Sequence, residues 1–154
     1  MSHITLRKAE LSDVQSLSER LREDDYNEIL ASGWEDSQEA LEKSFNCSQA
    51  INFTAEVDGL PTAMFGTHKK SFLGSESTVW FLGTCDVGKY PIEMFKTSKR
   101  VVSAFLLENT TLMNYVDVRY TKTFRWLDAL GFEIGEPFPF GINGEHFIKV
   151  IKRR

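Results

Sequence analysis

The sequence has 154 residues with a formal net charge of -4, and 42% of its residues are hydrophobic and 26% charged. This composition is that of an ordinary globular protein and predicts one domain over residues 1–154, while the acidic balance argues against a nucleic-acid partner. The sequence shows neither a secretion signal nor an apolar run long enough for a membrane span, so no membrane partner is expected.

The N-terminal third of the chain predicts one strand followed by two helices. Residues 4–8 alternate between apolar and polar side chains, which is typical of a half-buried strand. Ser12 and Gln15 have the spacing of a capping box at the start of a helix. The acidic residues 23–25 predict a solvated helix end and loop, and a second helix is expected to start near Asp36.

Three strands are expected in the middle of the chain. Residues 52–57 and 62–67 flank Asp58-Gly59, a dipeptide that is typical of tight hairpins. Residues 77–84 are apolar enough for a central strand that is covered on both faces. The pattern therefore predicts a hairpin followed by a buried strand.

The remaining elements alternate between helix and strand. Pro91 suits the first turn of a helix, and residues 112–118 predict a strand. Gly131 stands where the next helix must end, and we expect it to have a positive φ. Two final strands are expected near residues 132–138 and 146–151. This order of elements predicts a mixed sheet with helices on both faces.

The segment from Gly83 to Lys89 has the spacing of a phosphate-binding loop and lies between a predicted strand and a predicted helix. However, Tyr90 stands where a Ser or Thr would bind magnesium, and Asp86 places a negative charge inside the loop. We interpret the segment as an ordinary flexible loop. A nucleotide-binding module is kept as a third hypothesis.

The histidines and cysteines do not form a recognisable site. The three histidines are far apart in the sequence and lack the close spacing of a metal-binding pair, so no metal is expected. Cys47 and Cys85 have no paired spacing either, which favours a reduced intracellular protein. Cys85 is expected to be a buried and inert thiol.

The order of elements and two short motifs resemble the GNAT (Gcn5-related N-acetyltransferase) superfamily. The motifs lie at residues 6–9 (LRKA) and 126–132 (WLDALGF). More narrowly, nearly the whole chain, including residues 80–83 (WFLG), resembles the acetyltransferase-like internal virion proteins of short-tailed bacteriophages. The resemblance implies an α+β (α/β) fold with a mixed, mostly antiparallel central sheet of about seven strands and helices on both faces.

The resemblance also implies a cleft for acetyl-CoA, from which this sequence departs in two places. The cofactor-binding candidates are Leu82, Gly83, Thr84, Gly88 and Lys89. The pyrophosphate loop of the superfamily is richer in glycine than this one, and Pro91 removes a possible N–H donor from it. The tyrosine that commonly protonates the departing CoA thiolate falls at Leu127, which cannot donate a proton.

These departures predict degenerate acyl-CoA chemistry and no cofactor. The resemblance implies a bacteriophage acetyltransferase-like protein that serves virion assembly or the virion interior. Its expected partners are other phage or host proteins, and its expected location is the host cytoplasm or the virion. The alternative is an active N-acetyltransferase that uses acetyl-CoA to modify an amine of a protein or small molecule. In that case Asp86 and Asp117 are candidate general bases, and Tyr120 is a candidate replacement for the missing proton donor.

Overall fold

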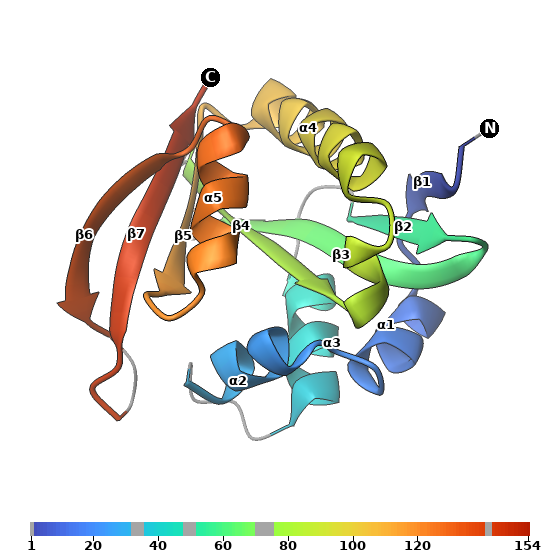
Figure 1. Ribbon diagram of the computed structural model, residues 1–154, viewed down its shortest axis with the longest axis horizontal. Helices are drawn as coiled ribbons and strands as arrows, with labels where there is room; N and C mark the ends of the chain where they lie inside the picture. Colours follow the sequence, from blue (N-terminus) through green and yellow to red (C-terminus); the bar gives the residue numbers. More distant parts are fainter. Residues whose placement is uncertain (1, 32–35, 48–51, 70–75, 141–142) are drawn as a thin grey trace.

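The computed structural model describes residues 2–31, 36–47, 52–69, 76–140 and 143–154. Its strands are β1 (Ile4–Lys8), β2 (Phe53–Val57), β3 (Leu60–Lys69), β4 (Glu76–Gly83), β5 (Thr111–Asp117), β6 (Glu133–Pro139) and β7 (His146–Arg153). Its helices are α1 (Leu11–Ser18), α2 (Glu23–Ala31), α3 (Ser37–Cys47), the 3₁₀ turn η1 (Cys85–Gly88), α4 (Pro91–Glu108) and α5 (Thr121–Ala129). The strands form one seven-stranded sheet in the order β1-β2-β3-β4-β5-β7-β6 (Figure 1).

The helices cover both faces of this sheet, as expected (Figure 1). Successive residues of β3 point to opposite faces, so Phe65 joins the core under α4 and α5 while Met64 joins the smaller core under α1 and α3. The larger core includes Val101 of α4 and Leu127 of α5, whereas the smaller one includes Leu17 of α1. No helix in the described part of the chain is long and apolar enough to cross a membrane.

The two central strands of the sheet part from each other. β4 and β5 form the single parallel pair among the strand pairs described, and residues 76–78 pair with residues 111–113. Beyond these positions β4 stays paired with β3 and β5 with β7. The carboxyl ends of the two parallel strands therefore border a cleft in the middle of the sheet, the position where open α/β sheets commonly bind ligands.

The acidic residues 23–25 do not form the solvated loop that the sequence predicts. They are the first turn of α2, so three helices precede β2 instead of two. Asp25 is only 5% exposed because it accepts hydrogen bonds from Arg22 and from the backbone N–H of Gly83. A run of charges seen in sequence gives no sign of such a distant partner.

The start of α1 also differs from its predicted capping box. The helix begins at Leu11, and the side chain of Asp13 accepts the N–H of Glu10 at 2.9 Å. The predicted pair, Ser12 and Gln15, lies two residues further along the chain. Asp13 takes this position because it is also bound by Arg7.

Gly131 ends α5 with a φ of 94°, as predicted from the sequence. Its N–H donates to the carbonyl of Asp128, and the N–H of Phe132 donates to the carbonyl of Leu127. These two bonds form a Schellman motif, in which the residue in the left-handed region is usually glycine. The buried side chains of Leu127 and Phe132 complete the motif, and the chain turns directly into β6.

Replacing Gly131 by valine should lower the free energy of unfolding by about 1–3 kcal/mol, because a β-branched residue at this positive φ is strained. The new Cβ would also displace the ammonium of Lys152, which is a flexible group that can move away. Urea denaturation of the variant measures the loss. Gly131→Asn should lose less, since asparagine tolerates the left-handed region better. Equal stability of the valine variant and the wild type would contradict this account.

Candidate functional site

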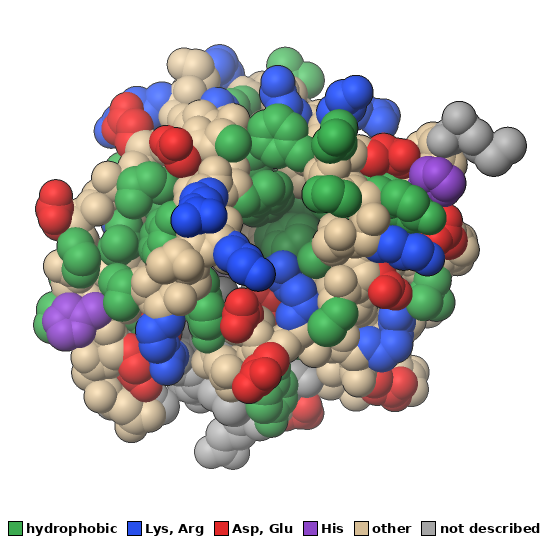
Figure 2. Space-filling view, viewed as in Figure 1, with side chains coloured by type: hydrophobic (Ala, Val, Ile, Leu, Met, Phe, Trp, Pro, Cys, Tyr) green, Lys and Arg blue, Asp and Glu red, His purple; other side chains and the backbone are tan. Residues whose placement is uncertain are grey.

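The parting of β4 and β5 leads into a cavity of about 400 Å³. Its walls come from the sheet, from α4 and from α5, and they include Phe65, Phe81, Val102, Phe105 and Trp126. Figure 2 shows a hollow in this face of the molecule with a hydrophobic floor and with Lys or Arg side chains on its rim. Small-molecule sites have this size and this mostly apolar character, so the cavity is the candidate site.

The turn between β4 and α4 bonds its own backbone donors. The N–H of Asp86 donates to the hydroxyl of Thr84 at 3.3 Å, and that of Val87 donates to the carbonyl of Thr84 at 3.2 Å. The N–H of Lys89 donates to the carbonyl of Asp86, and Pro91 at the first position of α4 has no N–H. Three N–H groups of this turn are therefore bonded within it, and Pro91 contributes none to the helix N-terminus that follows.

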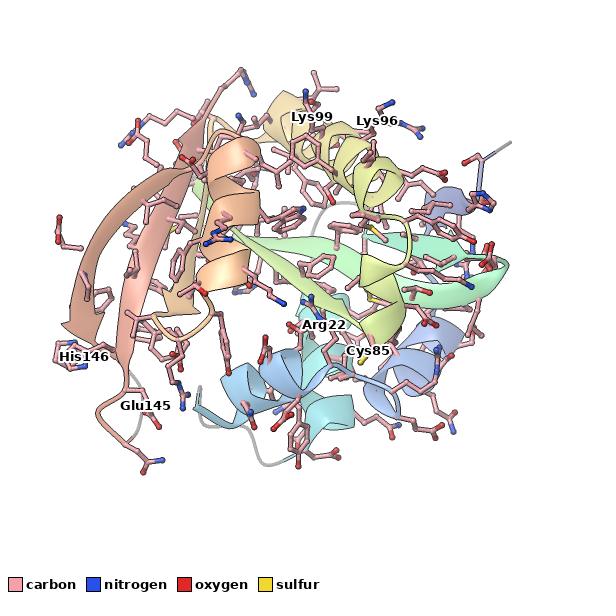
Figure 3. All side chains as sticks on the ribbon, viewed as in Figure 1. Arg22, Cys85, Lys96, Lys99, Glu145 and His146 are labelled. Carbon is pink, nitrogen blue, oxygen red and sulfur yellow. The ribbon has the colours of Figure 1, made fainter. Side chains whose placement is uncertain are left out.

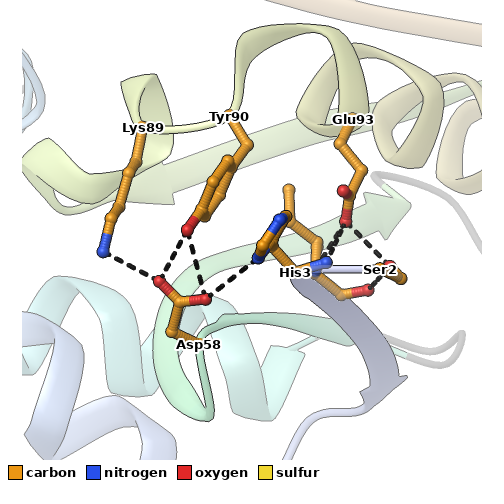
Figure 4. Close-up of polar contacts among 7 residues, drawn as sticks. Ser2, His3, Asp58, Lys89, Tyr90 and Glu93 are labelled. Carbon is orange, nitrogen blue, oxygen red and sulfur yellow. Dashed lines mark hydrogen bonds and ion pairs between the residues drawn. The ribbon is translucent and has the colours of Figure 1, made fainter.

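The side chain of Lys89 is held by Asp58, in the turn between β2 and β3 (Figure 4). Its Nζ lies 2.8 Å from Asp58, and the Tyr90 hydroxyl donates to the same carboxylate at 3.0 Å. The ring of His3 stacks on Tyr90 with 4.1 Å between centroids. The Lys89 ammonium holds the pKa of Asp58 below its usual value, and Asp58 raises the pKa of Lys89. The lysine of the loop is thus part of an ion pair within the protein.

The carboxylate of Glu93, in the first turn of α4, is bound by the residues at the start of the chain. It accepts the Ser2 hydroxyl at 2.8 Å and the N–H groups of His3 and Ile4 at 2.8 and 2.6 Å (Figure 4). The Ser2 hydroxyl and these N–H groups lower the pKa of Glu93. The N-terminal segment is therefore tied to the start of α4, and it fixes the adjoining turn together with Asp58.

The end of β4 is covered by residues at the start of α2. The N–H of Gly83 donates to Asp25 and its carbonyl accepts the N–H of Arg22, both at 2.9 Å. The N–H of Thr84 donates to the carbonyl of Thr62 on β3. Backbone groups that the parting of the strands would otherwise leave free at this point therefore have partners within the protein.

Of the five cofactor-binding residues expected from the sequence, Gly88 is the one that lines the cavity. Leu82 packs against the smaller core on the opposite face of the sheet. Backbone donors of Gly83 and Thr84 and the side chain of Lys89 are bonded within the protein. The structure does not bring the five together around one ligand position, and their assignment stays a prediction.

The three candidate catalytic residues also lie outside the cavity wall. Asp117 ends β5, is 1% exposed and is bound by Arg119 with an Oδ2–Nη2 distance of 2.6 Å. Arg119 lowers the pKa of Asp117, which makes the carboxylate a weaker base. Tyr120 is buried at the start of α5, and Asp86 is exposed in η1. Leu127, in the position expected for the proton-donating tyrosine, lies on the cavity wall.

The sequence analysis did not identify Arg22 and Asp25, which both line the cavity. Asp25 accepts from Nε and Nη2 of Arg22 at 2.9 and 3.0 Å, and the guanidinium lies 5.4 Å from the centre of the Phe81 ring. Burial raises the pKa of Asp25, and the charge of Arg22 opposes this shift. Figure 3 shows Arg22, the residue before α2, close to the end of β4. The sequence signal was the spacing of opposite charges three residues apart, which is common on helices.

Cys85 is exposed, so the expectation of a buried thiol is wrong. It is the first residue of η1, just after β4 ends, and it therefore lies outside the covered part of the sheet (Figure 3). Among the residues that the structure describes, no group of three or more His, Cys, Asp and Glu side chains could hold a metal ion.

Solved structures share this arrangement of elements over almost their whole length. An acetyltransferase of the GNAT family from Bacillus anthracis matches with a TM-score of 0.70 at 13% identity, over 99% of this chain and 95% of its own. The chain has the GNAT fold. A variant of the spermidine N-acetyltransferase SpeG from Vibrio cholerae matches this GNAT fold with a TM-score of 0.73 at 15% identity, over 99% and 95% of the two chains.

A third GNAT-fold relative is yncA from Salmonella typhimurium, whose structure contains its cofactor acetyl-CoA. It matches with a TM-score of 0.71 at 14% identity, over 99% of this chain and 94% of its own. No family model matches the sequence, and no curated protein sequence matches it. At these identities the likeness establishes the fold, and the function has to be argued from the site.

Proposed function

We propose that this protein keeps the central cleft of the GNAT fold but does not transfer acetyl groups. The proposal rests on one observation: hydrogen-bond donors around the cleft are already bonded to other groups of the protein. Three N–H groups of the turn before α4 are bonded within it, Asp58 holds Lys89, and Arg22 and Asp25 hold both backbone groups of Gly83. The pyrophosphate of CoA needs preorganised donors at a helix start, and bonding these groups to it would require breaking their present contacts.

The candidate general base and the expected proton-donor position support the same proposal. A general base must have a suitable pKa and reach the proton that it removes, but Asp117 is bound by Arg119 and has a lowered pKa. At the expected proton-donor position, Leu127 contributes an apolar surface to the cavity. The carboxylates that line the cavity are Asp24 and Asp25, and Asp25 already accepts three hydrogen bonds.

Calorimetric titration with acetyl-CoA should therefore give no binding, or a dissociation constant of about 1 mM or weaker. Incubation with acetyl-CoA and an amine such as spermidine should release no CoA above the rate without protein. The released CoA should be measured by chromatography, because the exposed Cys85 thiol would react with a thiol reagent. ATP with magnesium serves as a second titrant and should not bind either. Micromolar acetyl-CoA affinity would refute the proposal.

A variant of the turn before α4 tests whether this turn prevents acetyl-CoA binding. Changing Asp86 and Tyr90 to glycine and Pro91 to alanine removes a negative charge and restores an N–H donor at the start of α4. This triple variant should bind acetyl-CoA at least tenfold more tightly than the wild type. If its affinity stays unchanged while its fold is intact, the turn is not what prevents binding.

An active acetyl-CoA-dependent N-acetyltransferase is the second candidate function. The observation that favours it is Asp25, whose burial raises its pKa towards that of a useful general base and which lines the cavity. CoA release that depends on an added amine and is lost in Asp25→Asn would establish this alternative.

The resemblance to internal virion proteins supports a further part of the proposal, that the protein serves a bacteriophage inside the virion or during assembly, with phage or host proteins as partners. Mass spectrometry of purified particles of the encoding phage tests this part separately. We expect the protein at a fixed number of copies per particle. Its absence from particles and from assembly intermediates would contradict the virion role.

A further inference from the structure

We propose that the cavity binds a hydrophobic monocarboxylate such as a fatty acid, with the chain between α4 and α5 and the carboxylate at the mouth. This inference goes beyond the proposed function, because it names a ligand for the cleft that the lost acyl-CoA site leaves open. It rests on three features of the described residues: the size of the cavity, the chemistry of its walls and the donors that remain without a partner.

The volume of about 400 Å³ is suited to an aliphatic chain. An apolar cavity of about 150 Å³ in another protein stays dry and binds benzene, so on that scale this one accepts a chain of roughly ten to sixteen carbons. A hydrophobic chain that binds there removes apolar wall surface from water and gains packing contacts with the side chains of the wall.

The walls are apolar over most of the depth of the cavity. α4 contributes Val101, Val102 and Phe105, while α5 contributes Trp126 and Leu127. On the sheet side, the ring of Phe81 lies 5.2 Å from that of Trp126 and 4.9 Å from that of Phe65, which makes a continuous aromatic surface. A flexible hydrocarbon chain can pack along such a surface, whereas a polar or charged ligand group would lose its hydration there.

The polar groups that line the cavity and remain available are mainly donors. Arg22 uses Nε and Nη2 for Asp25, which leaves Nη1 without a hydrogen-bond partner among the described residues. Oδ1 of Asn114 accepts the N–H of Tyr115, and the amide nitrogen of Asn114 also has no hydrogen-bond partner among the described residues. Lys122 lines the cavity from the first turn of α5. Two cations and an amide donor favour a carboxylate at the mouth.

Two carboxylates also line the cavity, and neither reverses this preference. Asp25 is buried and compensated by Arg22 and by the N–H of Gly83, so its negative charge is already bonded. Asp24 and Lys122 are both exposed, so solvent and salt screen their charges alike, and the donors of Arg22 and Asn114 decide the preference. The bidentate contact with Asp25 also fixes the guanidinium of Arg22, which lowers the entropy cost of binding a ligand carboxylate.

Isothermal calorimetry with decanoate, decan-1-ol and decyltrimethylammonium tests the proposal on the full chain. We expect saturable binding of one decanoate per chain, at least tenfold tighter than that of the alcohol or the ammonium compound. Thermal unfolding in the presence of decanoate should shift upward with its concentration, as binding to the folded state requires. Equal affinity for all three probes would overturn the carboxylate assignment, and no saturable binding of decanoate would overturn the proposal as a whole.

Two variants locate the binding site. Val102→Phe fills the cavity and should weaken decanoate binding at least thirtyfold, while Ile92→Phe adds the same ring on the exposed side of α4 and should leave it unchanged. The double variant Arg22→Gln/Asp25→Asn removes the guanidinium without leaving a buried charge unpaired, and should weaken decanoate binding about tenfold but not decanol binding. Wild-type affinity for decanoate in Val102→Phe would overturn the site.

A competition titration separates this inference from the proposed function. Acetyl-CoA should not displace bound decanoate, because the turn before α4 gives its pyrophosphate no preorganised binding site. Displacement at micromolar acetyl-CoA would refute the proposed loss of acetyl-CoA binding, while the direct decanoate titration and the two variants would still decide the fatty-acid site.

Discussion

Replacing Gly66 by alanine is expected to lower the free energy of unfolding by about 3 kcal/mol. Gly66 lies in β3 directly opposite Trp80 of β4. An added Cβ would stand 2.2 Å from Cζ2 of the Trp80 indole and 2.5 Å from Oδ1 of Asn52, far closer than side-chain atoms can approach. The indole lies over the glycine and is partly buried against the smaller core, so a shift of the ring away from the new methyl group would break those packing contacts.

Urea denaturation at neutral pH measures this loss. Gly88→Ala is the matched control, because a Cβ there would meet no atom within 4 Å, and its stability should stay within about 0.5 kcal/mol of the wild type. Adding Trp80→Leu to Gly66→Ala should recover part of the loss by removing the ring that clashes. A Gly66→Ala variant as stable as Gly88→Ala would show that the packing argument is wrong.

Arg7→Met should cost about 3–5 kcal/mol, because it leaves the buried carboxylate of Asp13 without its counter-charge. Asp13 is 3% exposed and accepts hydrogen bonds from both terminal nitrogens of Arg7, each at 2.8 Å. It also accepts the Thr54 hydroxyl and the N–H of Glu10, both at 2.9 Å, so it joins β1, β2 and the start of α1. The double variant Arg7→Met/Asp13→Asn should be more stable than Arg7→Met alone, since the unpaired charge is gone.

The pH dependence provides a second measurement of the same network. Burial alone would raise the pKa of Asp13, but the bonds from Arg7, Glu10 and Thr54 outweigh burial and hold the pKa below its ordinary value of 3.8. Because the folded-state pKa is lowered, this stabilisation is fully present above pH 3.8 and is lost as the pH falls through the folded pKa. The stability difference between the wild type and Arg7→Met should therefore shrink in acid. A constant difference down to pH 2 would contradict a role for the Asp13 charge.

Local sequence patterns were sufficient to predict most of the helices, strands and turns. The hairpin at Asp58-Gly59 forms because both residues adopt the positive φ that such a dipeptide permits, at 50° and 82°. Pro91 opens α4 and Gly131 ends α5 for equally local reasons. The resemblance to the GNAT superfamily then indicated one mixed, mostly antiparallel sheet of about seven strands, and the structure and the fold comparison confirm it.

The site was less predictable, because its residues depend on partners that are remote in sequence. Lys89 could be recognised as the lysine of a loop, but its ion pair with Asp58 spans 31 residues. The exposed position of Cys85 likewise depends on where β4 leaves the sheet. The sequence of α4 and α5 likewise could not show that a cavity remains between the two helices.

The sequence by itself determined the elements whose causes lie within a few residues: strand periodicity, a turn dipeptide, a proline at a helix start and a glycine at a helix end. The tertiary structure alone decided the chemistry of the cleft. Asp25 is buried because the N–H of Gly83, 58 residues away, and Arg22 bind it where β4 ends. Hydrogen bonding and desolvation depend on distances in space, so a charge that looks solvated in the sequence becomes a buried part of the cavity wall in the fold.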